Sequence, residues 1–140
     1  MKSFLYAAFL SLVLTLLPSS ANADPVSDEW QVVITGQIEA FRASDGTAAL
    51  GFAARGFKAR FTDPAVFVQA IRDWGYSAIV DSRSHSFGAY QLVKPNVALQ
   101  AVTFTGPDQT LYQAIYQLER EESGWRIGGV QMMKTSAMGA

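Results

Sequence analysis

The spacing of apolar residues changes once along this chain, at Gly75, and that change restricts the fold more than any other feature. Before Gly75 the apolar residues recur every three or four positions, which is typical of one buried face of a helix. After Gly75 they alternate with polar residues, which is typical of strands with one face in a core. A helical half followed by a strand half predicts an α+β domain, with helices packed on one face of an antiparallel sheet.

Three helices are expected in the first half. The first spans about residues 28–43, and one face of it carries Trp30, Val33, Ile34, Ile38 and Phe41. Asp45 is a suitable cap for a second helix, which we expect to include residues 48–53. Asp63 and Pro64 can begin a third, because aspartate caps a first turn and proline is favoured at the first helical position.

Two further expectations follow from glycines in this half. Gly56 should interrupt the second helix, so that Phe57 and Phe61 lie on a short turn. Gly75 should close the third helix, whose expected apolar face consists of Val66, Phe67, Ala70, Ile71 and Trp74.

Four strands are expected in the second half, over residues 84–93, 97–105, 110–120 and 125–134. The loops between them are short and rich in turn-forming residues, namely Pro95-Asn96, Gly106–Gln109 and Glu121–Gly124. Short loops between successive strands predict an antiparallel meander.

The first 23 residues have the three parts of a cleavable secretory signal peptide. Lys2 supplies the positive start, and the largely apolar run from Phe4 to Leu17 is too short to span a bilayer. Ala21-Asn22-Ala23 is a small-x-small cleavage site, so we expect cleavage between Ala23 and Asp24. Residues 24–140 are then expected to form one periplasmic or secreted domain without a membrane span.

The composition removes several function classes. The chain has no cysteine, so disulfides, thiolate metal sites and thiol redox chemistry are excluded. After the signal, ten basic and twelve acidic residues remain without a basic stripe, so we expect no nucleic-acid partner. A single histidine excludes a multi-histidine metal site, and no glycine-rich phosphate loop is present, so neither a metal nor a cofactor is expected.

Several short motifs resemble those of a bacterial exported family, the domain of unknown function 4864. They extend over nearly all of the chain after the signal and comprise Gly36–Ala43 followed by Asp45-Gly46, Phe61–Pro64 with Phe67, Gly75-Tyr76, Ser84–Gly88, Gly106–Asp108 and Gly124–Gly129. In that family a cysteine often follows the closing Trp-Arg-Ile segment. This chain has Gly129-Val130 there, so no role of that cysteine is transferred.

That family resembles a branch of the nuclear transport factor 2-like superfamily, also called cystatin-like. The resemblance implies a cone, in which N-terminal helices pack on a curved antiparallel sheet of four or more strands. An apolar pocket often lies at the open end of such a cone. The superfamily includes isomerases, dehydratases, ligand carriers and interaction modules, so the fold does not select a function. No catalytic residues are established for the family, and none are transferred.

No catalytic residue stands out among the titratable side chains. The acidic residues fall on helix caps, helix starts, hairpin turns or outer faces, so no pair of carboxylates is expected in one cleft. His85 shares its strand face with Phe87, and both rings can point inward. His85 could act as a general base, although a lone histidine more commonly has a structural, hydrogen-bonded role.

The candidate ligand-binding residues lie on faces that a cone pocket would use. Gln37 interrupts the apolar stripe of the first helix, and a buried amide must bond either to the fold or to a ligand. Tyr112 and Tyr116 share one face of the third strand, where a hydroxyl could reach a pocket. With the neighbouring aromatic residues, the candidate set is Gln37, Phe41, Tyr76, His85, Phe87, Tyr112 and Tyr116.

Three functions remain open from the sequence. The first is non-enzymatic binding of a small apolar or amphipathic ligand, or of a protein partner, through the cone pocket. The second is an isomerase- or hydrolase-like enzyme that uses His85 with a pocket tyrosine. The third is a structural or regulatory interaction protein of the cell envelope. We favour the first, because the sequence shows no acid–base pair.

A homodimer through the sheet is a further hypothesis. Leu111 and Ile115 interrupt the polar outer face of the third strand. By simple alternation, Val130 and Met132 of the fourth strand fall on that same outer face, opposite the inward Trp125. An apolar patch of these four residues would mark either a two-fold interface or a surface that the C-terminal segment covers.

Overall fold

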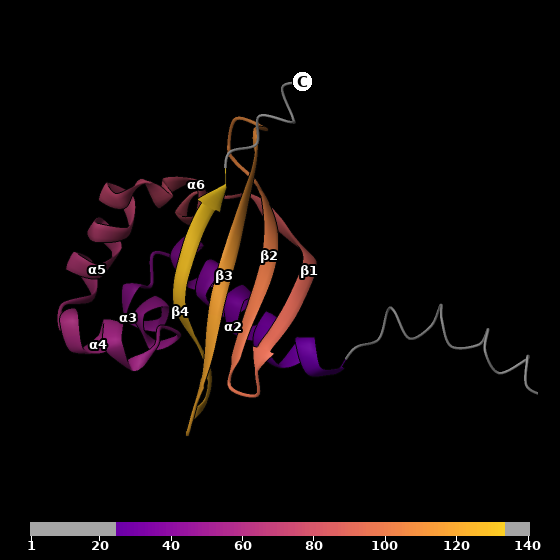
Figure 1. Ribbon diagram of the computed structural model, residues 1–140. Helices are drawn as coiled ribbons and strands as arrows, with labels where there is room; N and C mark the ends of the chain where they lie inside the picture. Colours follow the sequence, from indigo (N-terminus) through magenta and orange to yellow (C-terminus); the bar gives the residue numbers. More distant parts are fainter. Residues whose placement is uncertain (1–24, 134–140) are drawn as a thin grey trace, which may run out of the picture.

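The computed structural model describes residues 25–133 and places helices α2–α6 against one face of a four-stranded antiparallel sheet (Figure 1). The long helix α2 crosses that face, and the shorter helices gather beside β4 (Figure 1). The expected α+β architecture is therefore confirmed. The expected signal peptide and its cleavage site lie outside the described residues. No helix between residues 25 and 133 is long and apolar enough to cross a membrane.

Helix α2 (Pro25–Arg42) buries the stripe that its apolar spacing predicts. Trp30, Ile34 and Ile38 are fully buried in the core. The Trp30 indole nitrogen donates to the side-chain oxygen of Gln100 on the second strand, 2.9 Å away. Because Gln100 is itself fully buried, this bond fixes the start of α2 against the middle of the sheet.

Helix α3 (Gly46–Gly51) begins at the expected cap. The Asp45 carboxylate accepts a hydrogen bond from the Ala48 amide at 3.0 Å. The end of α3 lies close to α2, since a Cβ atom at Gly36 would lie 2.5 Å from the ring of Phe52. Glycine at this position therefore permits the close approach of the two helices.

The turn expected at Gly56 is wrong, because residues Arg55–Arg60 form a further short helix, α4. Gly56 has open space around it, so nothing in the packing forces the chain to bend there. The helical turn brings the Phe57 ring edge-on to Phe67, with ring centroids 6.3 Å apart. Partial burial of this ring against the core offsets the weak helix propensity of glycine.

Helix α5 (Pro64–Ile71) also begins at its expected cap, where the Asp63 carboxylate accepts from the Ala65 amide at 2.9 Å. It continues into a kinked turn, η1 (Arg72–Tyr76). Gly75 lies in that turn with a φ of 98°, a left-handed conformation that glycine adopts readily.

The buried face of this third helical region is narrower than expected. Phe67 is buried, whereas Val66 is 53% exposed and Trp74 is 48% exposed. The reason is that α5 packs against α3 instead of lying on the sheet, so only one side of it meets the core. A short helix that the sequence did not predict, α6 (Ser77–Val80), then leads to the first strand.

The sheet has the order β1-β2-β3-β4 with every pair antiparallel, which confirms the expected meander. Its strands are β1 (Ser84–Lys94), β2 (Val97–Thr105), β3 (Leu111–Glu121) and β4 (Gly124–Met133). Alternate residues of the two central strands are buried beneath the helices, among them Val102, Phe104, Ala114, Tyr116 and Leu118.

Strand β4 contains one extra residue. Leu118 pairs with Ile127, and the adjacent Gln117 pairs with Gly129, so Gly128 lies between two pairs without a partner of its own. An extra residue in one strand is a β-bulge, and it shifts the alternation of side chains by one position. Every residue of β4 after the bulge therefore faces the opposite side from the one that simple alternation predicts.

The bulge corrects the expected position of Val130 and Met132. Both pair with buried residues of β3, and both pack against the core on the inner face. The expected outer patch that joins them to Leu111 and Ile115 is therefore wrong. The homodimer stays a prediction, but Val130 and Met132, two of its four proposed contact residues, do not lie on the outer face of the sheet.

Candidate functional site

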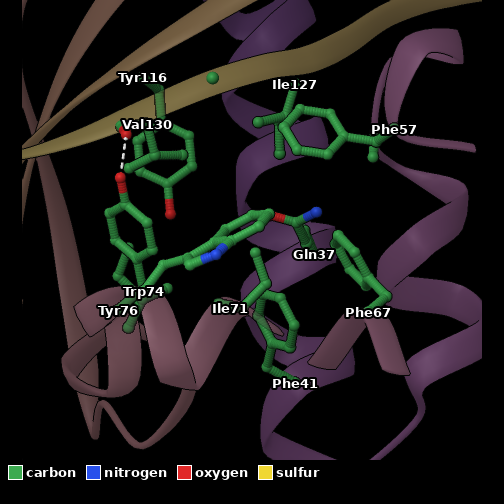
Figure 2. A pocket seen from close by; sticks show the side chains of 13 residues that line it. Gln37, Phe41, Phe57, Phe67, Ile71, Trp74, Tyr76, Tyr116, Ile127 and Val130 are labelled. Atoms are coloured by element: carbon green, nitrogen blue, oxygen red, sulfur yellow. Dashed lines mark hydrogen bonds between the residues drawn. The ribbon is translucent and has the colours of Figure 1, made fainter. Parts of the chain in front are cut away.

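A cavity of about 160 Å³ lies between the inner face of the sheet and the helices beside β4 (Figure 2). Residues of α2, α4, α5, η1, α6, β3 and β4 form its walls. Most of the lining is aromatic or aliphatic, and includes Phe41, Phe57, Phe67, Ile71, Ile79 and Ile127. The cavity is thus an extension of the apolar core that side chains do not fill.

Two irregular backbone segments direct side chains into this cavity. Ile127 and Val130 both line it, although residues three apart on a regular strand point to opposite faces. The bulge at Gly128 shifts the alternation by one residue, so both side chains face the cavity. Trp74 and Tyr76 come from the kinked turn η1, on either side of Gly75.

The Tyr116 hydroxyl is the most unusual group in the cavity. Tyr116 is fully buried, and its hydroxyl oxygen has no hydrogen-bond partner among residues 25–133. Figure 2 shows this hydroxyl directed away from β3 into the cavity. Burial raises the pKa of Tyr116 far above its usual range, so the group stays protonated and can donate a hydrogen bond.

Gln37 supplies a second polar group from the opposite wall. It is 5% exposed, and its amide nitrogen donates to the Ala49 carbonyl oxygen at 3.0 Å. Because that bond needs the nitrogen, the orientation of the carboxamide is fixed and its oxygen is the atom directed toward the cavity (Figure 2). The oxygen can only accept a hydrogen bond.

Tyr76 and Trp74 close the side of the cavity nearest η1. The Tyr76 hydroxyl donates to the Val130 carbonyl oxygen at 2.7 Å, so it links η1 to the edge of β4 (Figure 2). This hydroxyl is therefore already used within the fold, unlike that of Tyr116. Trp74 is 48% exposed and lies where the cavity approaches solvent, so its indole forms part of the rim.

The cavity has no formal charge of its own. Among the described residues that line it, none is an aspartate, glutamate, lysine, arginine or histidine. Nor do three or more potential metal ligands lie together anywhere between residues 25 and 133. The chemistry that the lining offers is hydrogen bonding through one donor and one acceptor, surrounded by apolar contacts.

His85 lies outside this cavity, near the start of β1, where its ring faces α2. Its Nε2 lies 3.0 Å from the Thr35 hydroxyl, and its Nδ1 lies 3.4 Å from Nη2 of Arg42. Because arginine can only donate, Nδ1 is the unprotonated nitrogen and Nε2 carries the hydrogen that Thr35 accepts. Burial, and then the charge of Arg42, lower the pKa of His85, which favours this neutral form.

The structure thus separates the seven candidate residues into two groups. Four of them meet in the cavity: Gln37, Phe41, Tyr76 and Tyr116. The other three do not line it: His85, Phe87 and Tyr112. Phe87 packs edge-on against His85, with ring centroids 5.5 Å apart. Tyr112 lies against Gly106 and lines a shallow groove beside α6.

The sequence did not identify several cavity residues as site residues. Phe67, Ile71 and Trp74 were recognised as an apolar face, but spacing alone does not show whether such a face meets other side chains or an open space. Val130 was placed on the wrong side of the sheet. The only signal for its true position was the glycine pair Gly128-Gly129, since a glycine within a strand often marks a bulge.

Comparison with known families agrees with this architecture. The family described as "Domain of unknown function (DUF4864)" matches residues 23–140. The chain belongs to the DUF4864 family. No curated protein matches this DUF4864 domain.

Two solved structures resemble the DUF4864 domain in fold. One is a nuclear transport factor 2-like protein of unknown function from Shewanella oneidensis MR-1, with 10% identity and a TM-score of 0.54 over 77% of this chain and 98% of that one. The other is a domain of unknown function with a cystatin-like fold from Nostoc punctiforme PCC 73102, with 15% identity and a TM-score of 0.52 over 84% of this chain and 82% of that one. These likenesses confirm the nuclear transport factor 2-like, or cystatin-like, fold expected from the sequence.

Proposed function

We propose that this DUF4864 domain is a non-enzymatic binding protein that holds a small, mainly apolar molecule in the cavity between α2, η1 and the β3–β4 strands. The observation that carries the proposal is the Tyr116 hydroxyl, which is fully buried, has no partner in the part of the chain that the structure describes, and is directed into an apolar space. A buried hydroxyl without a hydrogen bond costs about 1–3 kcal/mol. A ligand that bonds to Tyr116 would recover this free energy.

The shape of the cavity supports the same proposal. Side chains from helices and strands of the packed fold form its walls, so binding needs little ordering of the protein. The Trp74 indole and the Phe57, Phe67 and Ile71 side chains offer apolar surface that a ligand would remove from water. Each Å² of apolar surface that binding removes from water contributes about 25 cal/mol.

A binding role is favoured over catalysis by the kind of titratable group present. Among the described lining residues only the tyrosines can exchange a proton, and burial holds the Tyr116 proton in place at neutral pH. A general base works best when its pKa lies near the operating pH. His85 has both ring nitrogens within hydrogen-bonding distance of Thr35 and Arg42, away from the lining residues.

Titration with toluene, followed by NMR of methyl groups, tests the proposal. We expect saturable shifts at the methyls of Ile71, Ile127 and Val130, which line the cavity. The methyls of Ile34 and Val102, which are buried elsewhere in the core, should not shift. Absence of saturable shifts at the cavity methyls would show that the space does not accept a ligand.

A pair of substitutions on the same helical region separates cavity binding from nonspecific binding. Ile71→Phe adds bulk inside the cavity and should abolish the toluene shifts. Val66→Phe adds an aromatic ring at a position that is 53% exposed on α5, and should leave them unchanged. Equal effects of the two substitutions would contradict binding in this cavity.

We also propose that the domain works in the periplasm or outside the cell, after removal of residues 1–23. The support is the arrangement of Lys2, the apolar run and Ala21-Asn22-Ala23 at the start of the chain. Intact-mass measurement of the exported protein should give an N-terminus at Asp24. An exported product that keeps Met1 would refute the cleavage.

A further inference from the structure

The two polar groups of the cavity require different hydrogen-bond partners. The Tyr116 hydroxyl is a donor for which residues 25–133 provide no acceptor. The Gln37 oxygen is an acceptor, because its amide nitrogen is bonded to Ala49. Both residues line the same space of about 160 Å³, with the Tyr116 hydroxyl on one wall and the Gln37 carboxamide on another (Figure 2).

We infer that the ligand is a neutral molecule of about one ring that carries a hydroxyl group. This inference rests on the proposed function, since it specifies what the same cavity binds. The hydroxyl accepts a hydrogen bond from Tyr116 and donates one to Gln37, while the ring fills the apolar remainder of the cavity.

The cavity volume sets the size of the ligand. An engineered core cavity of about 150 Å³ stays dry and binds benzene. Pockets for drug-sized molecules are several times larger, about 300–1,000 Å³. At about 160 Å³, the space within this cavity matches one ring.

The electrostatics of the cavity exclude a charged ligand. The described lining residues provide no opposite charge, and the nearby guanidinium of Arg42 is bonded to Ser82 and His85 outside the cavity. A carboxylate or an ammonium group would lose its hydration without an ion pair in return. A neutral ligand avoids that penalty.

The hydrogen-bond inventory favours a neutral group that both donates and accepts, and a hydroxyl is the smallest such group. A carbonyl can accept from Tyr116 but cannot donate to Gln37, so it satisfies only one of the two. A hydrocarbon satisfies neither. A hydroxyl both donates and accepts, and so completes the hydrogen bonding of both walls.

Four one-ring probes test this inference: toluene, phenol, benzaldehyde and benzoate. The quantity to compare is the affinity for each probe divided by the affinity for toluene, measured in the wild type and in variants by methyl NMR. Phenol must lose the same hydration in every variant, so a change in this ratio reports only its bonds in the cavity. We expect Tyr116→Phe to lower the phenol ratio about threefold to tenfold, the value of one neutral hydrogen bond.

Tyr112→Phe is the matched control, because it also removes a tyrosine hydroxyl from β3, but from a side chain that does not line the cavity. It should leave the phenol ratio unchanged. Gln37→Met should lower the phenol ratio and not the benzaldehyde ratio. If Gln37→Met does not fold, the wild-type Gln37 side-chain amide provides the same test, since its resonance should shift more with phenol than with toluene.

The outcomes separate the two proposals. If none of the four probes binds in the cavity, both the proposed function and this inference fail. If toluene binds but Tyr116→Phe leaves the phenol ratio unchanged, or if benzoate binds most tightly, the binding function stands and the neutral hydroxyl ligand is refuted. If Tyr116→Phe lowers the benzaldehyde and phenol ratios equally while neither Gln37 test responds to phenol, the ligand carries a carbonyl instead.

Discussion

Replacement of Tyr116 by phenylalanine should stabilise this protein, although it removes a polar group from a buried tyrosine. The hydroxyl is fully buried and has no hydrogen-bond partner within the described residues, 25–133. In the unfolded chain the same hydroxyl is bonded to water. Folding therefore loses those bonds and gains none, and phenylalanine at this position avoids the loss.

The expected gain can be worked from the desolvation of one hydroxyl. A buried, unpaired hydroxyl costs about 1–3 kcal/mol. Phenylalanine keeps the ring and its contact with Phe104, whose centroid lies 6.3 Å from that of Tyr116. We therefore expect Tyr116→Phe to raise the free energy of unfolding by about 1–3 kcal/mol without ligand. For a domain of this size, each 1 kcal/mol raises Tm by roughly 4 °C.

Urea denaturation followed by circular dichroism is the assay, and Tyr76→Phe is the matched control. The Tyr76 hydroxyl donates to the Val130 carbonyl oxygen at 2.7 Å, so its removal breaks a bond and leaves a carbonyl unpaired. We expect this variant to lose about 1–2 kcal/mol. The same chemical change at two positions of one cavity should thus have opposite signs.

The reasoning is refuted if Tyr116→Phe lowers the free energy of unfolding by about 1 kcal/mol or more, the loss typical of a broken hydrogen bond. That result would mean that the hydroxyl has a partner in solution. The hydroxyl could then not serve as the free donor on which the ligand proposal depends.

Three further predictions concern the rest of the fold. Burial and the charge of Arg42 lower the pKa of His85 below its ordinary value of 6.5, so the folded state binds fewer protons than the unfolded state. The free energy of unfolding should therefore be highest above pH 6.5 and fall at lower pH. His85→Gln should flatten this part of a pH–stability profile. Gly36→Ala should destabilise by about 1 kcal/mol or more, since its Cβ would lie 2.5 Å from the Phe52 ring, whereas Gly51→Ala meets open space and should be neutral or slightly stabilising in the same denaturation assay. Trp125→Ala should cost about 3–5 kcal/mol because the side chain is 5% exposed in the core; a loss below about 1 kcal/mol would contradict its inward position.

The features that the sequence determined are those that depend on neighbours a few positions away. Asp45 and Asp63 cap helices because each carboxylate bonds to an amide two or three residues further along the chain. The strand meander follows from alternation and from short turns such as Pro95-Asn96, which are also local. Gly75 was placed at a helix end for the same kind of reason, and its left-handed φ agrees.

Part of the candidate site could also be predicted, because burial follows from periodicity. Gln37 attracted attention as a polar residue within an apolar stripe, and the structure places it in the cavity wall. Gln100 carried a similar signal between Ala98 and Val102 but was missed. It is fully buried, and its amide nitrogen donates to the Gly88 carbonyl oxygen at 3.0 Å, next to an irregularity in β1.

The tertiary structure alone decided which of these side chains enclose a space and which of them lack a partner. The bulge at Gly128 depends on how β4 pairs with β3, and it turns Val130 inward, against simple alternation. The Tyr116 hydroxyl is unpaired because α2, α5 and η1, which line the cavity around it, place no acceptor within hydrogen-bonding distance of it among the described residues. Periodicity specifies the direction of a side chain relative to its own element. Whether its polar atom finds a partner depends on other elements distant in the sequence, whose positions only the packed fold sets.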